Sequence, residues 1–161
     1  ALGSLNMNKI AILQLIARRL ESDLEQASDA AIESAESATH EESRAEGKYD
    51  TRGLEASYLA SGQARHAVEL RESLAAVKNF NLPDFTQSSP IALGALVTLL
   101  SSRGREIFFL APGMGGIEIP CDDNSTITVI SSRSPIGNEL LGKSVGDRIQ
   151  AGGDKTIIRI S

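Results

Sequence analysis

Carboxylates crowd the stretch from Thr39 to Tyr58, and they are the side chains in this chain most able to do chemistry. The acids are Glu41, Glu42, Glu46, Asp50 and Glu55, with Gly47 and Gly53 among them. Acidic residues are common at exposed turns, so a solvated surface turn is the simplest interpretation. Asp50 has a second structural interpretation, because an Asp ahead of a helix accepts backbone N–H bonds as an N-cap.

Other residue types that support catalysis are sparse. His40 and His66 lie far apart without a partner at metal-ligand spacing, so we expect no metal site in the isolated protein. The single cysteine, Cys121, has no visible base partner and cannot form an internal disulfide. A lone cysteine favours a reducing compartment, and no apolar run or signal peptide indicates a membrane or export. We therefore expect a cytoplasmic protein with no membrane contact.

Two long helical patterns flank the acidic stretch and must position it. Small and apolar residues recur in steps of four and three, which is the 3.5-residue repeat of a coiled coil. The seam positions are Leu13, Ala17, Leu20, Leu24, Ala27, Ala31, Ser34 and Ala38 in the first pattern, and Ala56, Ala60, Gln63, Ala67, Leu70, Leu74 and Val77 in the second. Small residues lie near the acidic stretch in both patterns, which favours an antiparallel hairpin. Half of a compact helical bundle is the alternative. Gly62 lies inside the second pattern, where we expect it to permit a close contact.

After the linker 79–90 the hydrophobic period changes from 3.5 to 2. Short β-branched or aromatic runs separated by turn residues predict five or six strands. The predicted strands are 95–100, 106–110, 116–119, 126–130, 145–150 and 155–160. Ser134 and Pro135 are typical of a helix start and Gly142 of its end, so one short helix is expected over 135–141.

The composition excludes several function classes. Aromatic residues make up 4% of the 161 residues and Trp is absent, which argues against a base-stacking platform or an aromatic-lined pocket. The formal net charge of −5 argues against a basic nucleic-acid footprint over the whole surface.

The stretch SPIGNELLGKSVGD resembles the C-terminal motif of the bacterial Gre transcript-cleavage factors. The matching residues are Ser134, Pro135, Ile136, Leu140, Leu141, Gly142, Lys143, Val145, Gly146 and Asp147. The order of parts is similar too, with a long helical hairpin, a short linker and a small sheet domain. The resemblance covers nearly the whole chain from Met7, and other polymerase-binding proteins share the motif.

The resemblance implies a partner and a role. Its C-terminal domain would have the fold of immunophilin-type prolyl isomerases and dock at the secondary channel of RNA polymerase. The hairpin would enter the channel, where Asp50, Glu46 or Glu55 would act beside the polymerase's Mg²⁺ during hydrolysis of backtracked RNA. Lys48 and Arg52 would contact phosphates, or balance the acids. Asn138, Glu139 and Lys143 would face the polymerase, with Arg103, Arg105 and Arg133 as further cationic candidates. The chain would bind no cofactor alone, act as a monomer and not be an enzyme by itself.

One departure from the Gre pattern leaves the activity open. Gre factors carry an Asp and, three positions later, a Glu at the tip, whereas Asp50 is followed by Gly53 at that spacing. A channel binder that inhibits or modulates the polymerase without stimulating cleavage is therefore an alternative. A prolyl isomerase and a plain coiled-coil module are further alternatives. The adjacent Phe108 and Phe109 argue against an isomerase pocket, since neighbouring strand residues point to opposite faces.

These observations predict an α+β fold. Residues 1–6 are interpreted as a cloning scar. Residues 7–82 are expected to form a long antiparallel coiled-coil hairpin, and 83–161 a small antiparallel sheet domain of immunophilin-like fold with one short helix.

Overall fold

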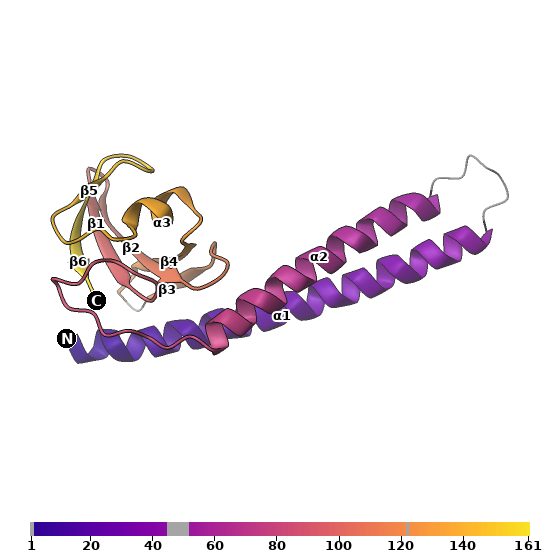
Figure 1. The fold of residues 1–161 in the computed structure, drawn as a ribbon, viewed down its shortest axis with the longest axis horizontal. Coiled ribbons are helices and arrows are strands. Elements are labelled where there is room, and N and C mark those ends of the chain that lie inside the picture. The colour runs from indigo at the N-terminus through magenta and orange to yellow at the C-terminus, as the bar shows by residue number, and fades with distance from the viewer. Residues whose placement is uncertain (1, 45–51, 122) are drawn as a thin grey trace. The chain divides into compact units, whose positions relative to one another are not determined.

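The computed structural model describes the backbone of residues 2–44, 52–121 and 123–161, and the side chains of 9–39, 60–121 and 123–161. The chain divides into two compact units. One comprises Ala1–Ile16 together with Ala76–Ser161, and the other comprises Ala17–Ala75. The predicted α+β class is confirmed, because two long helices precede a six-stranded sheet with a short helix (Figure 1).

The chain begins with two long helices, α1 (Leu2–Arg44) and α2 (Arg52–Lys78). The second unit consists of the parts of these helices that lie within Ala17–Ala75. Within it the buried apolar residues fall on the predicted seam, at Leu20, Ala27, Ala38, Ala67 and Leu70. Residues of both helices, including Ala27 and Gln63, line one small depression. Neither described helix contains a stretch apolar enough to cross a bilayer.

Gly62 does not permit a close contact, and that expectation was wrong. A Cβ built on Gly62 would meet no described atom within 4 Å. The residue is exposed, whereas the neighbouring seam residue Gln63 is half-buried. The backbone freedom of Gly62 is thus a cost to the helix without a packing gain.

The start of α1 belongs to the same unit as the sheet. Lys9, Ile12 and Ile16 recur at helical spacing and are all buried. The Lys9 Nζ donates a hydrogen bond of 3.0 Å to the main-chain oxygen of Ser161 and lies 4.4 Å from the centroid of the Phe85 ring. The heptad pattern did not predict this row of buried residues. The pattern describes contacts between helices, whereas these three residues pack within the sheet unit.

The sheet has the strand order β3-β4-β2-β1-β6-β5. Its strands are β1 (Leu96–Ser101), β2 (Gly104–Ala111), β3 (Glu118–Pro120), β4 (Thr126–Ser131), β5 (Arg148–Ile149) and β6 (Lys155–Ile160). The expectation of an antiparallel sheet was wrong, because β2 and β4 pair in parallel. Parallel neighbours need a crossover of about a dozen residues or more. The segment between Ala111 and Thr126 supplies this crossover. It contains β3, which pairs antiparallel with the edge of β4 that faces away from β2.

The main core of the sheet unit lies between one face of the sheet and α3 (Pro135–Leu140). Alternate strand residues contribute to it, among them Val97, Leu99, Phe108 and Leu110. Leu140 of α3 is fully buried in the same cluster. Phe109 is also buried but lies outside this cluster, as expected for a residue that points to the opposite face.

Candidate functional site

The proposed tip residues lie largely outside the described part of the chain. Glu46, Lys48 and Asp50 are not described. Arg52 and Glu55 lie in the first turns of α2, but their side chains are not described. The chemistry expected of the tip therefore stays a prediction.

The SPIGNELLGKSVGD segment begins with a hydrogen-bonded helix cap, as predicted. Ser134 is the N-cap of α3, and its Oγ accepts a hydrogen bond of 3.1 Å from the Gly137 amide. The same Oγ donates a hydrogen bond of 2.8 Å to the main-chain oxygen of Ser131. Pro135 occupies the first helical position, where its missing N–H and fixed φ cost nothing.

Close packing explains the glycine at position 137. A Cβ there would collide with the main-chain oxygen of Ser131 and approach the Ser134 Oγ to 2.9 Å. After α3, Gly142 adopts a φ of 80°, which turns the chain back. The Gly142 amide then donates to the Ile91 oxygen, and the Ile91 amide donates to the Lys143 oxygen, each at 2.8 Å. These two bonds fix the end of the segment to Ile91, which lies ahead of β1 in the chain.

The three docking candidates in this segment have different surroundings. Asn138 is exposed and Lys143 is half-buried. Glu139 is bound within the domain, because its two carboxylate oxygens accept hydrogen bonds from the amides of Gln150 and Ala151 at 2.8 and 2.9 Å. These bonds hold the pKa of the Glu139 carboxyl below its usual value, with a smaller contribution from the Lys143 ammonium. Glu139 thus fixes the turn between β5 and β6.

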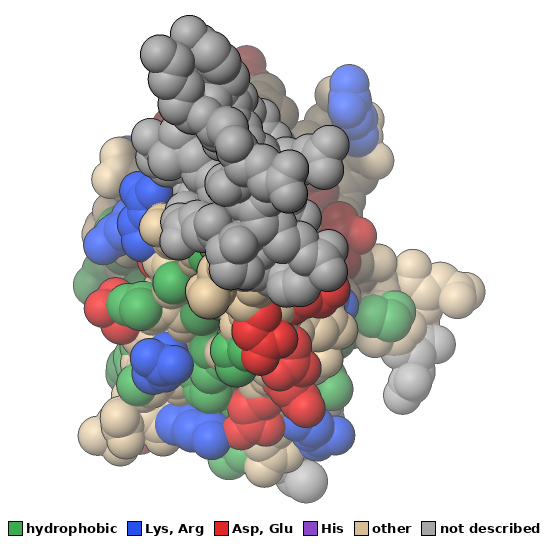
Figure 2. Space-filling view, turned by 90° about the vertical axis from the view of Figure 1, so that its right-hand side faces the viewer, with side chains coloured by type: hydrophobic (Ala, Val, Ile, Leu, Met, Phe, Trp, Pro, Cys, Tyr) green, Lys and Arg blue, Asp and Glu red, His purple; other side chains and the backbone are tan. Residues whose placement is uncertain are grey.

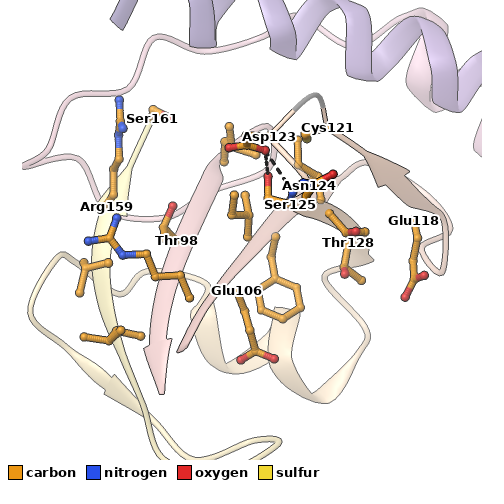
Figure 3. A pocket seen from close by; sticks show the side chains of 18 of the residues that line it. Thr98, Glu106, Glu118, Cys121, Asp123, Asn124, Ser125, Thr128, Arg159 and Ser161 are labelled. Carbon is orange, nitrogen blue, oxygen red and sulfur yellow. Dashed lines mark hydrogen bonds between the residues drawn. The ribbon is translucent and has the colours of Figure 1, made fainter. Parts of the chain in front are cut away.

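A broad groove with a volume of about 1340 Å³ lies on the sheet unit (Figure 3). A row of residues crosses four strands along its floor. Arg159 on β6 lies opposite Thr98 on β1, Thr98 opposite Ile107 on β2, and Ile107 beside Ile127 on β4. Cross-strand partners share one face, so the row forms a continuous surface.

The charges around the groove come from separate elements. Arg105 and Arg159 line it from β2 and β6. Asp123 lies in the turn before β4, where it accepts hydrogen bonds from the amide and hydroxyl of Ser125 (Figure 3). These bonds lower the pKa of the Asp123 carboxyl. Among the described residues, neither arginine forms an ion pair.

Glu106 also lines the groove but is paired. The Lys155 Nζ lies 2.7 Å from its Oε2 and 5.6 Å from the centroid of the Phe108 ring. Although that oxygen is buried, its alignment with the ammonium is not that of a hydrogen bond, so the pair is an ionic contact. Lys155 itself is buried, and its charge is thus balanced inside the domain.

The remaining chemistry of the described residues is limited. No cluster of three or more His, Cys, Asp or Glu side chains in the described ranges is placed to hold a metal ion. Cys121 is half-buried, and its Sγ lies 3.9 Å from the main-chain oxygen of Ile119. Basic and acidic side chains are interspersed on the face drawn in Figure 2 rather than segregated by sign.

Known structures that are similar to this chain include two Gfh1 proteins. The crystal structure of the GreA factor homolog 1 (Gfh1) protein of Thermus thermophilus has 20% identity and a TM-score of 0.35, with coverage of 90% of this chain and 94% of that chain. The crystal structure of Thermus aquaticus Gfh1 has 21% identity and a TM-score of 0.33, with coverage of 89% and 92%. Neither a family model nor a curated protein matches this sequence. At TM-scores this low, neither likeness supports a conclusion about function.

Sequence reasoning missed the groove and one of its two arginines. Arg105 was considered as a cationic contact, but Arg159 was not. The register between β1 and β6 brings Arg159 beside Thr98, and that pairing joins segments that are far apart in the sequence. The available signal was Arg159, a charged residue between Ile158 and Ile160 in the strand Lys155–Ile160. A charge inside a strand indicates that one face is not fully covered.

Proposed function

We propose that this chain is a bacterial transcription elongation regulator of the cytoplasm that binds RNA polymerase at its secondary channel. In this proposal α1 and α2 pair as an antiparallel coiled-coil hairpin, the sheet unit has an immunophilin-like fold and docks on the polymerase, and the chain acts as a monomer. The resemblance of Ser134–Asp147 to the Gre motif is the observation that carries the proposal. The local structure of this segment supports it, because the side-chain cap at Ser134 and the positive φ of Gly142 explain why serine and glycine occur at that spacing.

The dimensions of the helices fit a probe that enters a channel. At about 1.5 Å per residue, α1 extends roughly 40 Å from Ala17 to Arg44. Small buried residues such as Ala27, Ala38 and Ala67 would keep the paired helices slim. The acidic stretch follows α1 directly, so it would lie at the far end of the probe.

Asp50 is the residue through which we propose the tip acts. The polymerase holds its own Mg²⁺, and oxygen ligands suit that ion. A carboxylate brought beside it would change its occupancy and so the hydrolysis of backtracked RNA. The protein would not be an enzyme itself but would alter the polymerase's own cleavage reaction. Lys48 and Arg52 would contact nucleic-acid phosphates in the channel.

The second candidate function is channel binding without stimulation of cleavage. It is favoured by Gly53, which stands where the Gre pattern has its second acid. With one carboxylate fewer, the tip would obstruct the channel more than it assists the metal.

Replacing Asp50 with Asn tests the role of the tip, because it removes the charge and retains the size and part of the capping capacity. We expect unchanged polymerase binding and an altered rate of transcript cleavage or elongation in backtracked complexes. Glu46→Gln and Glu55→Gln should have smaller effects and serve as matched controls. An Asp50→Asn protein equal to the wild type would assign Asp50 to capping and favour obstruction of the channel.

A further inference from the structure

We propose that residues 80–87 form a strap that holds the start of α1 on the sheet unit and that opens without unfolding of the sheet. The strap and the start of α1 belong to the same compact unit, Ala1–Ile16 with Ala76–Ser161. Figure 1 shows the stretch after α2 running beside the first turns of α1. The composition of 79–90 indicates only a linker, whereas the structure gives this stretch defined contacts. The strap concerns the sheet unit alone, so it holds or fails independently of polymerase binding.

Phe80 is the first anchor of the strap. A Cβ built on Gly94 would lie 2.9 Å from the Phe80 ring and 3.1 Å from the Cδ of Pro83. The Gly94 amide donates a hydrogen bond of 2.7 Å to the main-chain oxygen of Leu110 on β2. The Phe80 ring therefore lies directly against main chain that is bonded to the sheet.

Phe85 is the second anchor. Its half-buried side chain packs against the core cluster of the sheet unit. The Lys9 Nζ lies 4.4 Å from the centroid of the Phe85 ring, which is within the range of a cation–π contact. The same Nζ donates to the Ser161 oxygen, which also accepts a hydrogen bond of 2.8 Å from the Leu96 amide on β1. Lys9 thus joins α1, the strap and the sheet at one point.

Gln87 is the third anchor. Its Oε1 accepts a hydrogen bond of 3.2 Å from the Ile160 amide on β6. Ile160 is buried, whereas Gln87 is exposed. The amide of a buried strand residue therefore has its acceptor on a strap side chain. When the strap opens, this amide loses its acceptor, so Ile160 reports the state of the strap.

The anchors are weaker than the contacts within the sheet. Each anchor is a single side chain, whereas the strands are joined by ladders such as the one between β1 and β2. Lys9 is 2% exposed, and burial of an ammonium carries a desolvation penalty that a hydrogen bond and a ring face offset only in part. Segments with few buried contacts open at a lower free energy than the core. The strap therefore opens by local unfolding, and 80–87 then becomes a flexible connection.

Native-state hydrogen exchange of the full-length protein, followed by NMR at low urea concentrations, tests the strap. The Ile160 amide reports opening of the strap. The Val129 amide, which donates a hydrogen bond of 2.8 Å to the Ile117 oxygen, reports opening of the sheet. We expect Ile160 to exchange at least about tenfold faster than Val129 and with a weaker dependence on urea, because a local opening exposes less surface.

Two variants should open the strap, and a third is the control. Lys9→Ala and Phe85→Leu should each raise the ratio of the Ile160 exchange rate to the Val129 exchange rate by at least about threefold, because each removes the contact between ammonium and ring. The ratio corrects for any loss of global stability, which Val129 measures. Gln14→Ala should leave the ratio unchanged, because Gln14 is exposed on the same part of α1.

Four results would overturn the proposal. Equal exchange rates and equal urea dependence for Ile160 and Val129 would show that the strap opens only with the sheet. Exchange of Ile160 at the rate of an unprotected peptide would show that the strap is not closed in solution. An unchanged ratio in both Lys9→Ala and Phe85→Leu, or an equal rise in Gln14→Ala, would remove Lys9 from the closure.

Discussion

The Nζ of Lys9 and the main-chain oxygen of Ser161 lie 3.0 Å apart, although the two residues are 152 positions apart in the chain. This hydrogen bond joins the start of α1 to the residue that follows β6. Burial of Lys9 lowers the pKa of its ammonium from 10.5 to about 8, and the nearby Asp84 carboxylate offsets part of that shift.

Lys9 should therefore titrate near pH 8 in the folded protein. NMR of protein labelled at the lysine ε-carbons should show one signal with a midpoint of about 8, and Lys9→Met should remove that signal. A midpoint near the ordinary lysine value of about 10.4 would contradict the burial of this group.

The same pKa shift predicts the sign of a pH dependence. Between about pH 8 and 10.5 the unfolded chain holds a proton on Lys9 that the folded chain has lost, so stability rises with pH in that window. The free energy of unfolding of the wild type should increase over this range relative to Lys9→Met. Parallel pH profiles in urea unfolding would show that Lys9 is not buried as described.

Glu139→Gln should loosen the turn between β5 and β6. A carboxylate accepts both amide hydrogen bonds, whereas an amide side chain has one acceptor oxygen and would turn its NH₂ group toward the other donor. We expect a lower urea midpoint at neutral pH and faster hydrogen exchange at the amides of Gln150 and Ala151.

The effect of Glu139 should depend on pH with a definite sign. Its pKa is lowered in the folded state, so its contribution is present above about pH 4.3, the ordinary value for Glu, and is lost as pH falls through the folded-state pKa. The difference between wild type and Glu139→Gln should shrink in acid. Glu118→Gln is the control, because Glu118 is an exposed carboxylate for which the described residues provide no hydrogen bond. Equal effects of both substitutions would rule out the proposed clamp.

Gly62→Ala should stabilise the protein by about 1 kcal/mol, since alanine favours the helix and the added Cβ meets open space. Gly137→Ala should instead destabilise it by about 1–3 kcal/mol, because its Cβ would collide with the Ser131 oxygen. Thermal unfolding of both variants measures the contrast. A loss of stability in Gly62→Ala would mean that α2 packs more closely there than described.

Local patterns predicted the elements of this chain better than their pairing. The cap at Ser134, the proline after it and the turn at Gly142 are local signals, and α3 ends within one residue of its expected end. The parallel pairing of β2 with β4 depends on where a crossover returns, which no local pattern encodes. The burial of Lys9 was also missed, because its partners Phe85 and Ser161 are distant in sequence.

The candidate sites divide in the same way. A motif of fourteen consecutive letters identified Ser134–Asp147 directly, whereas the groove is assembled from residues on five strands. The docking role of Glu139 stays a prediction, and the structure adds that its carboxylate accepts hydrogen bonds from the amides of Gln150 and Ala151. Sequence alone could not distinguish these roles, because both are consistent with a polar residue on a short helix.

Competition for core RNA polymerase tests the proposed function most directly. The full-length chain, labelled at a surface position, would be titrated with core polymerase, and an authentic Gre factor would then be added. We predict saturable binding that the Gre factor displaces completely, because both would occupy the secondary channel. Failure to bind the polymerase, or binding that excess Gre factor leaves unchanged, would contradict the proposal.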